Sequence, residues 1–155
     1  MKILVDADAC PAKNEILEIC QRHKIVPVFV ANNEIPAIAE STRAKMQVVP
    51  GAFDAADDWI VEQADEGDLI LTADLLLAQR LVKKKAEAMN FSGGMFTDEI
   101  IHDLVARREI QQYLREMNLP CHKPVRYGKE NRSHLKASLH QWIELHLRRE
   151  RANAK

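Results

Sequence analysis

The chain has 155 residues, of which 46% are hydrophobic and 29% are charged, and its formal net charge is −1. This length supports one domain with a single core, and this composition excludes a disordered chain. Export and membrane insertion are also disfavoured, because Asp6 and Asp8 precede any long apolar segment and no run approaches the roughly 18 apolar residues of a membrane span.

The first part of the chain alternates between strand and helix patterns. Ile3 to Val5 is an apolar run that ends at Asp6, which is typical of a buried parallel strand. Pro11 suits a first helical turn and apolar residues then recur at helical spacing, which predicts a helix from Pro11 to His23. A second apolar strand is expected from Ile25 to Val30, before turn residues.

The next segment gives weaker signals. Glu34 to Lys45 is expected to form a loop or a short helix, and Gln47 to Val49 a short third strand. Asp54, followed three residues later by Asp57, resembles a helix N-cap with its acidic partner. A helix is therefore predicted from this cap to about Glu66.

The second half begins with the apolar run Leu69 to Leu71, a predicted fourth strand that ends before Asp74. The remaining elements expected are a helix from about Leu75 to Met89, a strand at Met95-Phe96, a helix from Asp98 to about Met117 capped by Thr97, and a basic helix from about Asn131 to Arg151. Strands that alternate with helices imply right-handed βαβ units. We predict an α/β fold, with one three-layer domain over residues 1–155 and a central, mostly parallel sheet.

Acidic side chains follow two of the expected strands. Asp6 and Asp8 follow the first strand, and Asp74 follows the fourth. Ligands of open α/β sheets bind outside the carboxyl ends of the strands, so these three carboxylates should meet. A second acidic group can join them only if its helix begins at the same edge of the sheet; it consists of Asp54, Asp57 and Asp58.

Carboxylates gathered in one place repel one another unless a cation compensates their charge. Mg²⁺ or Mn²⁺ is favoured, because both prefer carboxylate and water oxygens, and the sequence has no close His/Cys cluster that would favour zinc. Such an ion can polarise a phosphoryl oxygen and activate a water for in-line attack. The sequence therefore predicts a divalent-cation site.

Several of these residues also have purely structural interpretations. The Asp54 and Asp57 pair can act only as a helix cap, and Asp68 after Gly67 is typical of a turn. Cys10 at a helix N-terminus has no identifiable His partner, which favours packing. Three histidines of the last helix are six residues apart and turn by about 240° from one to the next, so surface or packing roles are expected; they are His134, His140 and His146.

Charge is unevenly distributed along the chain. Residues 51–74 include eight acidic residues and no Lys or Arg, whereas residues 123–155 include nine basic and three acidic residues. A basic helix is usually a solvated surface, but it can also hold an anionic polymer beside an acidic pocket. The three cysteines are an odd number without C-x-x-C spacing, which argues against a disulfide framework and favours a reducing cytoplasm.

Three ordered segments carry a family resemblance. They are Val5-Asp6-Ala7-Asp8-Ala9-Cys10-Pro11, Phe53-Asp54-Ala55-Ala56-Asp57-Asp58-Trp59-Ile60-Val61 and Gly67-Asp68-Leu69-Ile70-Leu71-Thr72-Ala73-Asp74. Over nearly the whole chain the sequence resembles the YaiI/YqxD family of bacterial proteins, which is similar to PIN-domain-like nucleases. Those nucleases bind Mg²⁺ or Mn²⁺ through acidic residues at strand ends and cleave phosphodiester bonds, usually in RNA. The family's Asn-Pro-Arg-Gly turn is replaced here by Asn90-Phe91-Ser92-Gly93.

The resemblance implies a PIN-like fold and a Mg²⁺- or Mn²⁺-dependent nuclease that acts on RNA or single-stranded nucleic acid. The implied metal ligands are Asp6, Asp8, Asp54, Asp57, Asp58 and Asp74, of which Asp6, Asp8 and Asp74 are the expected catalytic residues. The implied phosphate or sugar contacts are Asn32 and Arg107.

Two other functions remain open at this point. One is a haloacid-dehalogenase-like phosphatase with Asp6 as nucleophile and Asp8 as acid. That class needs a Ser or Thr after the second strand, where this chain has Ala31-Asn32. The other is a non-catalytic module that binds nucleic acid or a partner.

Overall fold

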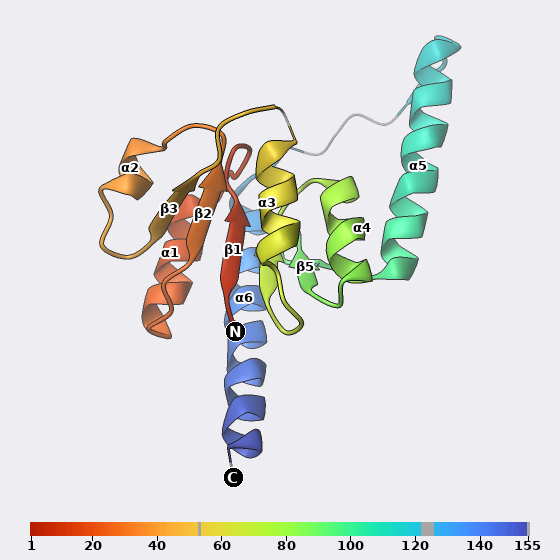
Figure 1. Ribbon diagram of the computed structural model, residues 1–155. Helices are drawn as coiled ribbons and strands as arrows, with labels where there is room; N and C mark the ends of the chain where they lie inside the picture. The colour runs from red at the N-terminus through yellow and green to blue at the C-terminus, as the bar shows by residue number, and fades with distance from the viewer. Residues whose placement is uncertain (53, 122–125, 155) are drawn as a thin grey trace.

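A computed structural model describes residues 1–52, 54–121 and 126–154 (Figure 1). Phe53 of the second family-like segment lies outside the described residues, as do Lys123 and Lys155 of the basic end. None of the described helices is long and apolar enough to cross a membrane.

Six strands form one sheet in the order β3-β2-β1-β4-β5-β6. Their bounds are β1 Ile3–Asp6, β2 Val28–Ala31, β3 Lys45–Val48, β4 Leu69–Leu71, β5 Glu87–Met89 and β6 Met95–Phe96. The first five strands are parallel to one another, and β6 is antiparallel to β5. The carboxyl ends of β1, β2 and β4 therefore lie at the same edge of the sheet.

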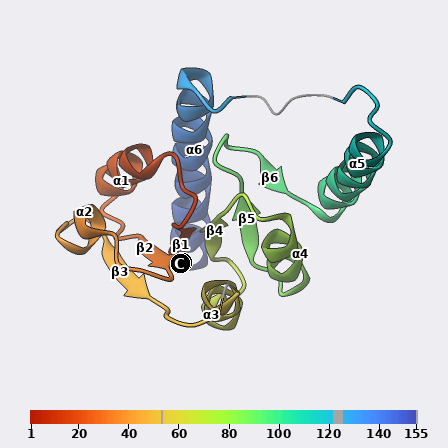
Figure 2. The ribbon, with the colours of Figure 1, turned by 90° about the horizontal axis from the view of Figure 1, so that it is seen from above.

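Helices cover both faces of this sheet. Their bounds are α1 Lys13–Arg22, α2 Pro36–Ala39, α3 Ala55–Gln63, α4 Leu75–Lys83, α5 Asp98–Glu116 and α6 Lys129–Asn153. Seen from above, α1 and α6 lie on one face, α3 and α4 lie on the other, and α5 lies beyond α4 (Figure 2). The expected three-layer α/β fold with a mostly parallel sheet is confirmed, and it is consistent with a PIN-like fold.

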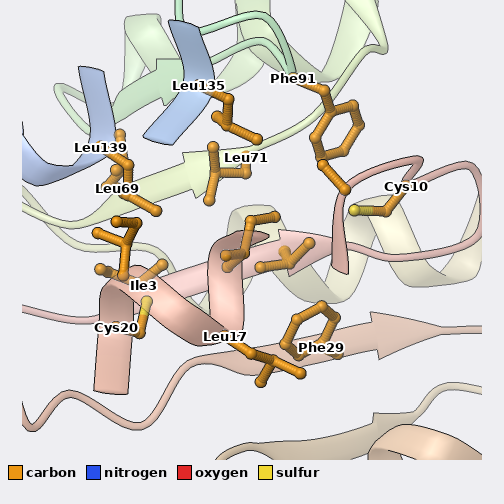
Figure 3. Packing of buried hydrophobic residues seen from close by; sticks show 14 of the residues in the cluster. Ile3, Cys10, Leu17, Cys20, Phe29, Leu69, Leu71, Phe91, Leu135 and Leu139 are labelled. Carbon is orange, nitrogen blue, oxygen red and sulfur yellow. The ribbon is translucent and has the colours of Figure 1, made fainter. Parts of the chain in front are cut away.

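Alternate residues of the central strands supply the two core layers. Ile3 of β1 and Leu71 of β4 face α1 and α6, where they join the cluster that includes Leu139 (Figure 3). Leu4 and Ile70 point to the opposite face, toward α3 and α4. Full burial of such a side chain contributes about 1.5–3 kcal/mol, so the two faces together fix the position of both strands.

The helix expected from Leu75 to Met89 is too long, because α4 ends at Lys83 and the segment after it forms β5. Lys85 adopts a left-handed conformation with φ 67°, which ends the helix without a glycine. Ala88 then pairs with Ile70 of β4 on one side and Phe96 of β6 on the other. Sheet pairing and burial override the helical propensity of this segment.

The other boundaries differ from the expected ones by a few residues. The helix expected from Pro11 begins at Lys13, and the strand expected from Ile25 begins at Val28. The expected loop or short helix before β3 contains α2. Thr97 caps α5 as predicted, since its hydroxyl accepts the N–H of Ile100 at 3.2 Å.

The turn between β5 and β6 is fitted closely against α6. Gly93 has φ +88°, and a Cβ at this position would lie 2.8 Å from the His134 carbonyl oxygen and 2.5 Å from the Ser138 hydroxyl. The Asn131 side chain also donates a 2.9 Å hydrogen bond to the hydroxyl of Ser92. Glycine is needed at position 93 for both its backbone conformation and the space it leaves.

Candidate functional site

A cavity of about 540 Å³ lies at the carboxyl ends of the central strands. Four carboxylates line it: Asp6 at the end of β1, Asp8 in the loop after β1, Asp57 in the first turn of α3 and Asp74 at the N-cap of α4. The remaining lining residues are Ala9, Asn32, Ala73, Leu76 and Arg108. Asp57 joins the site because β3 ends at the same edge as β1, so that α3 begins there.

A chain of hydrogen bonds joins Asp6 to Asp74 through a buried threonine. The Thr72 hydroxyl donates to the Asp6 carboxylate at 2.7 Å and accepts the backbone N–H of Asp74 at 2.9 Å. The Asp74 carboxylate in turn accepts the N–H groups of Leu76 and Leu77, at 2.9 and 3.2 Å. Both carboxylates are thereby held in fixed orientations. Thr72 was not predicted from the sequence, because a threonine that follows a strand carries no signal of what it contacts.

Burial and repulsion between like charges disfavour the ionised forms of two of these carboxyl groups. Burial raises the pKa of Asp6, as do the charges of Asp74 and Asp8, while the hydrogen bond from Thr72 lowers it. Burial and the neighbouring charges of Asp6 and Asp74 raise the pKa of Asp57 to about 6. A bound cation would favour the ionised form of both groups.

Asn32 follows β2 and completes the wall of the pocket. Its backbone N–H donates to the Asp8 carboxylate at 3.3 Å. Its side-chain oxygen Oδ1 is buried and has no hydrogen-bond partner among the described residues. Buried acceptors are normally paired, so this unpaired oxygen is an exception among the described side chains.

Other predicted site residues lie outside the pocket lining. Asp54 is the N-cap residue of α3 as predicted, but it is exposed and its side chain makes no capping hydrogen bond. Asp58 is 59% exposed and pairs with Arg80 at 2.8 Å. Arg107 and Arg108 are both exposed on α5, but only Arg108 lines the pocket. Adjacent helical residues differ by about 100° in direction, and the sequence alone does not show which one faces a site.

Two of the structural interpretations are confirmed. Cys10 is buried, and burial raises the pKa of its thiol to about 11, so it is a packing residue. Asp68 shapes its turn by accepting the N–H of Asp65 at 2.9 Å and that of Lys2 at 2.8 Å.

The C-terminal part of the basic helix α6 does not lie beside the acidic pocket. The C-terminus of α6 is at the opposite edge of the sheet from the arrowhead of β1 (Figure 1). Nearer the N-terminus of α6, Lys136 pairs with Glu18 of α1 at 2.9 Å and Arg132 with Glu15 at 3.5 Å. That this helix holds an anionic polymer stays a prediction, which only the N-terminal part of α6 could fulfil next to the pocket.

The histidines of α6 have separate environments. His146 stacks on Trp142 with 3.7 Å between ring centroids and contacts Glu87 at 2.9 Å, which is the expected packing role. His134 is exposed. His140 instead meets His23 of α1, so a His cluster exists in space although none exists in the sequence.

A second cavity of about 390 Å³ adjoins the acidic pocket and shares Ala9, Ala73 and Arg108 with it. Its apolar lining includes Leu75, Phe91, Phe96, Leu104 and Tyr127. The Tyr127 hydroxyl donates to the Phe91 carbonyl at 2.6 Å, which fixes the ring in the wall of the cavity.

The fold and the site define an α/β protein with a carboxylate-lined pocket at the carboxyl edge of a parallel sheet. A family model described as "Uncharacterized BCR, YaiI/YqxD family" matches residues 4–145. The chain belongs to this family, which confirms the resemblance.

Curated relatives cover most of the chain. A UPF0178 protein of Rhodospirillum rubrum is 35% identical over 144 residues, which are 93% of this chain and 96% of the relative. A UPF0178 protein of Brucella ovis is 39% identical over 131 residues, 84% of this chain and 81% of the relative. A UPF0178 protein of Rhodospirillum centenum is 41% identical over 117 residues, 76% and 75% of the two chains. No solved structure matches the chain.

Proposed function

We propose that this chain is a Mg²⁺- or Mn²⁺-dependent nuclease that acts on RNA or single-stranded nucleic acid. The observation that supports this function best is the convergence of four carboxylates, from three separate segments of the chain, in one cavity. One guanidinium, that of Arg108, stands among the lining residues. A site with this charge balance suits a cation together with an anionic phosphodiester.

The donor set fits a hard divalent cation. Asp6, Asp8, Asp57 and Asp74 offer carboxylate oxygens, and Asn32 offers a buried amide oxygen without a partner. All of these are oxygen ligands of the kind that Mg²⁺ and Mn²⁺ prefer. The raised pKa values of Asp6 and Asp57 are what carboxylates show before a cation compensates their charge.

Different residues of the protein would position the cation and the substrate phosphate. Asp6 and Asp74 are held by hydrogen bonds from Thr72 and from the first turn of α4, so they would hold a cation without rearranging. The cation would supply charge compensation at the phosphoryl group and a more acidic water. Arg108, which lines both cavities, would bind a phosphate oxygen of the substrate.

The neighbouring apolar cavity favours an unpaired strand as the substrate. Recognition of single strands typically combines stacking of bases on aromatic side chains with contacts to phosphates. Tyr127 is partly exposed and lines the cavity beside Arg108, so its ring could stack on a base, whereas Phe91 and Phe96 are buried and form the apolar wall. Bases within a duplex are already stacked and would not enter.

The decisive experiment compares two aspartate variants in cleavage of single-stranded RNA. The wild-type protein should cut RNA with Mn²⁺ or Mg²⁺ and lose activity in a chelator. Asp74→Asn should abolish cleavage and keep the fold, because the asparagine oxygen can still cap α4. Asp58→Asn, at an exposed residue outside the pocket lining, should remain active.

The alternatives predict different results in the same assay. Hydrolysis of small phosphomonoesters through a phosphoaspartate at Asp6, without cleavage of RNA or DNA, would establish the phosphatase. Absence of both activities in metal-loaded protein would favour the binding module.

A second pair of variants tests the substrate contact. Arg108→Gln should weaken RNA binding and reduce its salt dependence by about one released ion, whereas Arg107→Gln should change little. Equal effects of the two substitutions would remove Arg108 from the substrate site.

A further inference from the structure

Two histidines and a glutamate meet between α1 and α6. His23 is the C-cap residue of α1, and His140 and Glu144 lie one turn apart on α6. His23 Nε2 is 2.9 Å from His140 Nδ1, and His23 Nδ1 is 3.6 Å from Glu144 Oε1. One ligand atom from each residue lies within 4.8 Å of the other two.

The packing of α6 fixes the positions of these ligands. Leu139 and Ile143 are fully buried in the core layer between the sheet and α6, so the side of α6 that faces α1 is set. The His23 side chain is only 8% exposed, whereas that of Glu144 is 42% exposed. The group is therefore both ordered and open to solvent on one side.

We propose that His23, His140 and Glu144 form a binding site for a borderline transition-metal ion such as Zn²⁺. Two imidazole nitrogens and one carboxylate are a common zinc ligand set that leaves a fourth position open for water. Zn–N bonds of about 2.0–2.1 Å place tetrahedral ligands roughly 3.3 Å apart. The 2.9 Å separation of His23 Nε2 and His140 Nδ1 is close to that value. Glu144 lies against the other ring nitrogen of His23, so a side chain must turn for all three residues to reach one ion.

This site is independent of the carboxylate pocket in place and in chemistry. α1 leaves the carboxyl edge of β1 and ends at the opposite edge of the sheet (Figure 1). His23, its C-cap residue, is therefore at the edge away from the carboxylate pocket. Its nitrogen ligands favour zinc over Mg²⁺, whereas the carboxylate pocket offers only oxygen. An ion bound here would join α6 to α1.

The test is titration of tag-free protein with Zn²⁺ by calorimetry. A Cys121→Ser background removes the exposed thiol as a competing ligand. One equivalent of Zn²⁺ should bind and raise the melting temperature, and Co²⁺ should give the strong visible absorption of a tetrahedral site. His140→Ala should weaken Zn²⁺ binding at least tenfold, while His134→Ala, at an exposed residue of the same helix, should not.

Two further variants distinguish this site from Zn²⁺ binding elsewhere on the chain. Asp74→Asn should leave the Zn²⁺ affinity unchanged, which excludes binding in the carboxylate pocket. Glu144→Gln is nearly isosteric and should also weaken Zn²⁺ binding. It keeps the proposal testable if circular dichroism shows that His140→Ala is unfolded. If neither substitution changes the Zn²⁺ affinity or the rise in melting temperature that Zn²⁺ causes, the proposed site is wrong. The two histidines would then form only a hydrogen-bonded pair.

Discussion

The hydroxyl of Thr72 donates a 2.7 Å hydrogen bond to the carboxylate of Asp6 from a completely buried position. The same oxygen accepts the N–H of Asp74 at 2.9 Å. One side chain thus orients the carboxylate at the end of β1 and the backbone that leads into α4.

Thr72→Val keeps the shape of this side chain and removes both hydrogen bonds. The pKa of Asp6 should rise further, because the bond from Thr72 favours the ionised carboxylate. Stability should fall by about 1–3 kcal/mol, since the N–H of Asp74 loses its acceptor. Carbon-detected NMR titration and urea unfolding measure the two effects. An unchanged Asp6 titration would show that the bond does not control this carboxylate.

Asp57 should make the stability of the metal-free protein depend on pH. Its pKa of about 6 in the folded state exceeds the ordinary aspartate value near 3.9, so unfolding releases its proton. The stabilising contribution is therefore complete below about pH 4 and is lost as pH rises through about 6. The difference in pKa sets an upper bound of about 3 kcal/mol, which solvent screening of this partly exposed group reduces to about 1 kcal/mol.

Asp57→Asn should remove this part of the pH dependence. In chelator, the variant should gain stability relative to the wild-type protein as pH rises from about 4 to about 7. Thermal unfolding across this range measures the difference, and added Mg²⁺ should reduce it. A constant difference between the two proteins at every pH would contradict the raised pKa.

Gly93→Ala should destabilise the protein more than Gly67→Ala. Both glycines have positive φ, +88° and +90°, so both substitutions carry a similar backbone cost of about 1–2 kcal/mol. Only at Gly93 would the new methyl group collide with α6, which adds about 1–3 kcal/mol of overpacking. A Cβ at Gly67 meets nothing within 4 Å. Equal losses in urea unfolding would show that α6 moves aside freely.

Asp68→Ala should cost about 3 kcal/mol, because the N–H groups of Lys2 and Asp65 would lose a carboxylate acceptor that is only 5% exposed. Asp65→Ala is the matched control. It removes an exposed carboxylate that also pairs with Lys2, at 2.9 Å, and should have a much smaller effect. Chemical denaturation measures both, and similar losses would place the stabilising contact in the exposed pair instead.

The ends of β1 and β4 were predictable from the sequence, because both strands appear as short apolar runs followed by polar residues that include Asp6 and Asp74. Asp6 and Asp74 share a sheet edge for that reason, and the structure brings them into one pocket. β5 was not predictable, since Glu87, Ala88 and Met89 all favour helices locally and form a strand only through the sheet edge beside them.

Features that depend on contacts distant in the sequence were missed for a related reason. Thr72 acts through Asp6, 66 positions away, and His23 meets His140 across 117 positions. The periodicity of one helix correctly separated His140 from His134 and His146 but contained no information about α1. Arg108 faces the pocket and Arg107 does not, and the two alternatives are equivalent until the rotation of α5 is known.

The position of α6 in the core affects when the chain can finish folding during synthesis. This last helix contributes Leu135, Leu139, Trp142 and Ile143 to the layer that covers one whole face of the sheet. Synthesis proceeds from the N-terminus, so β1 and β4 leave the ribosome while α6 is still inside the exit tunnel. Folding of this layer is therefore completed only after α6 has been synthesised, and a truncated chain without α6 would expose part of an apolar sheet face.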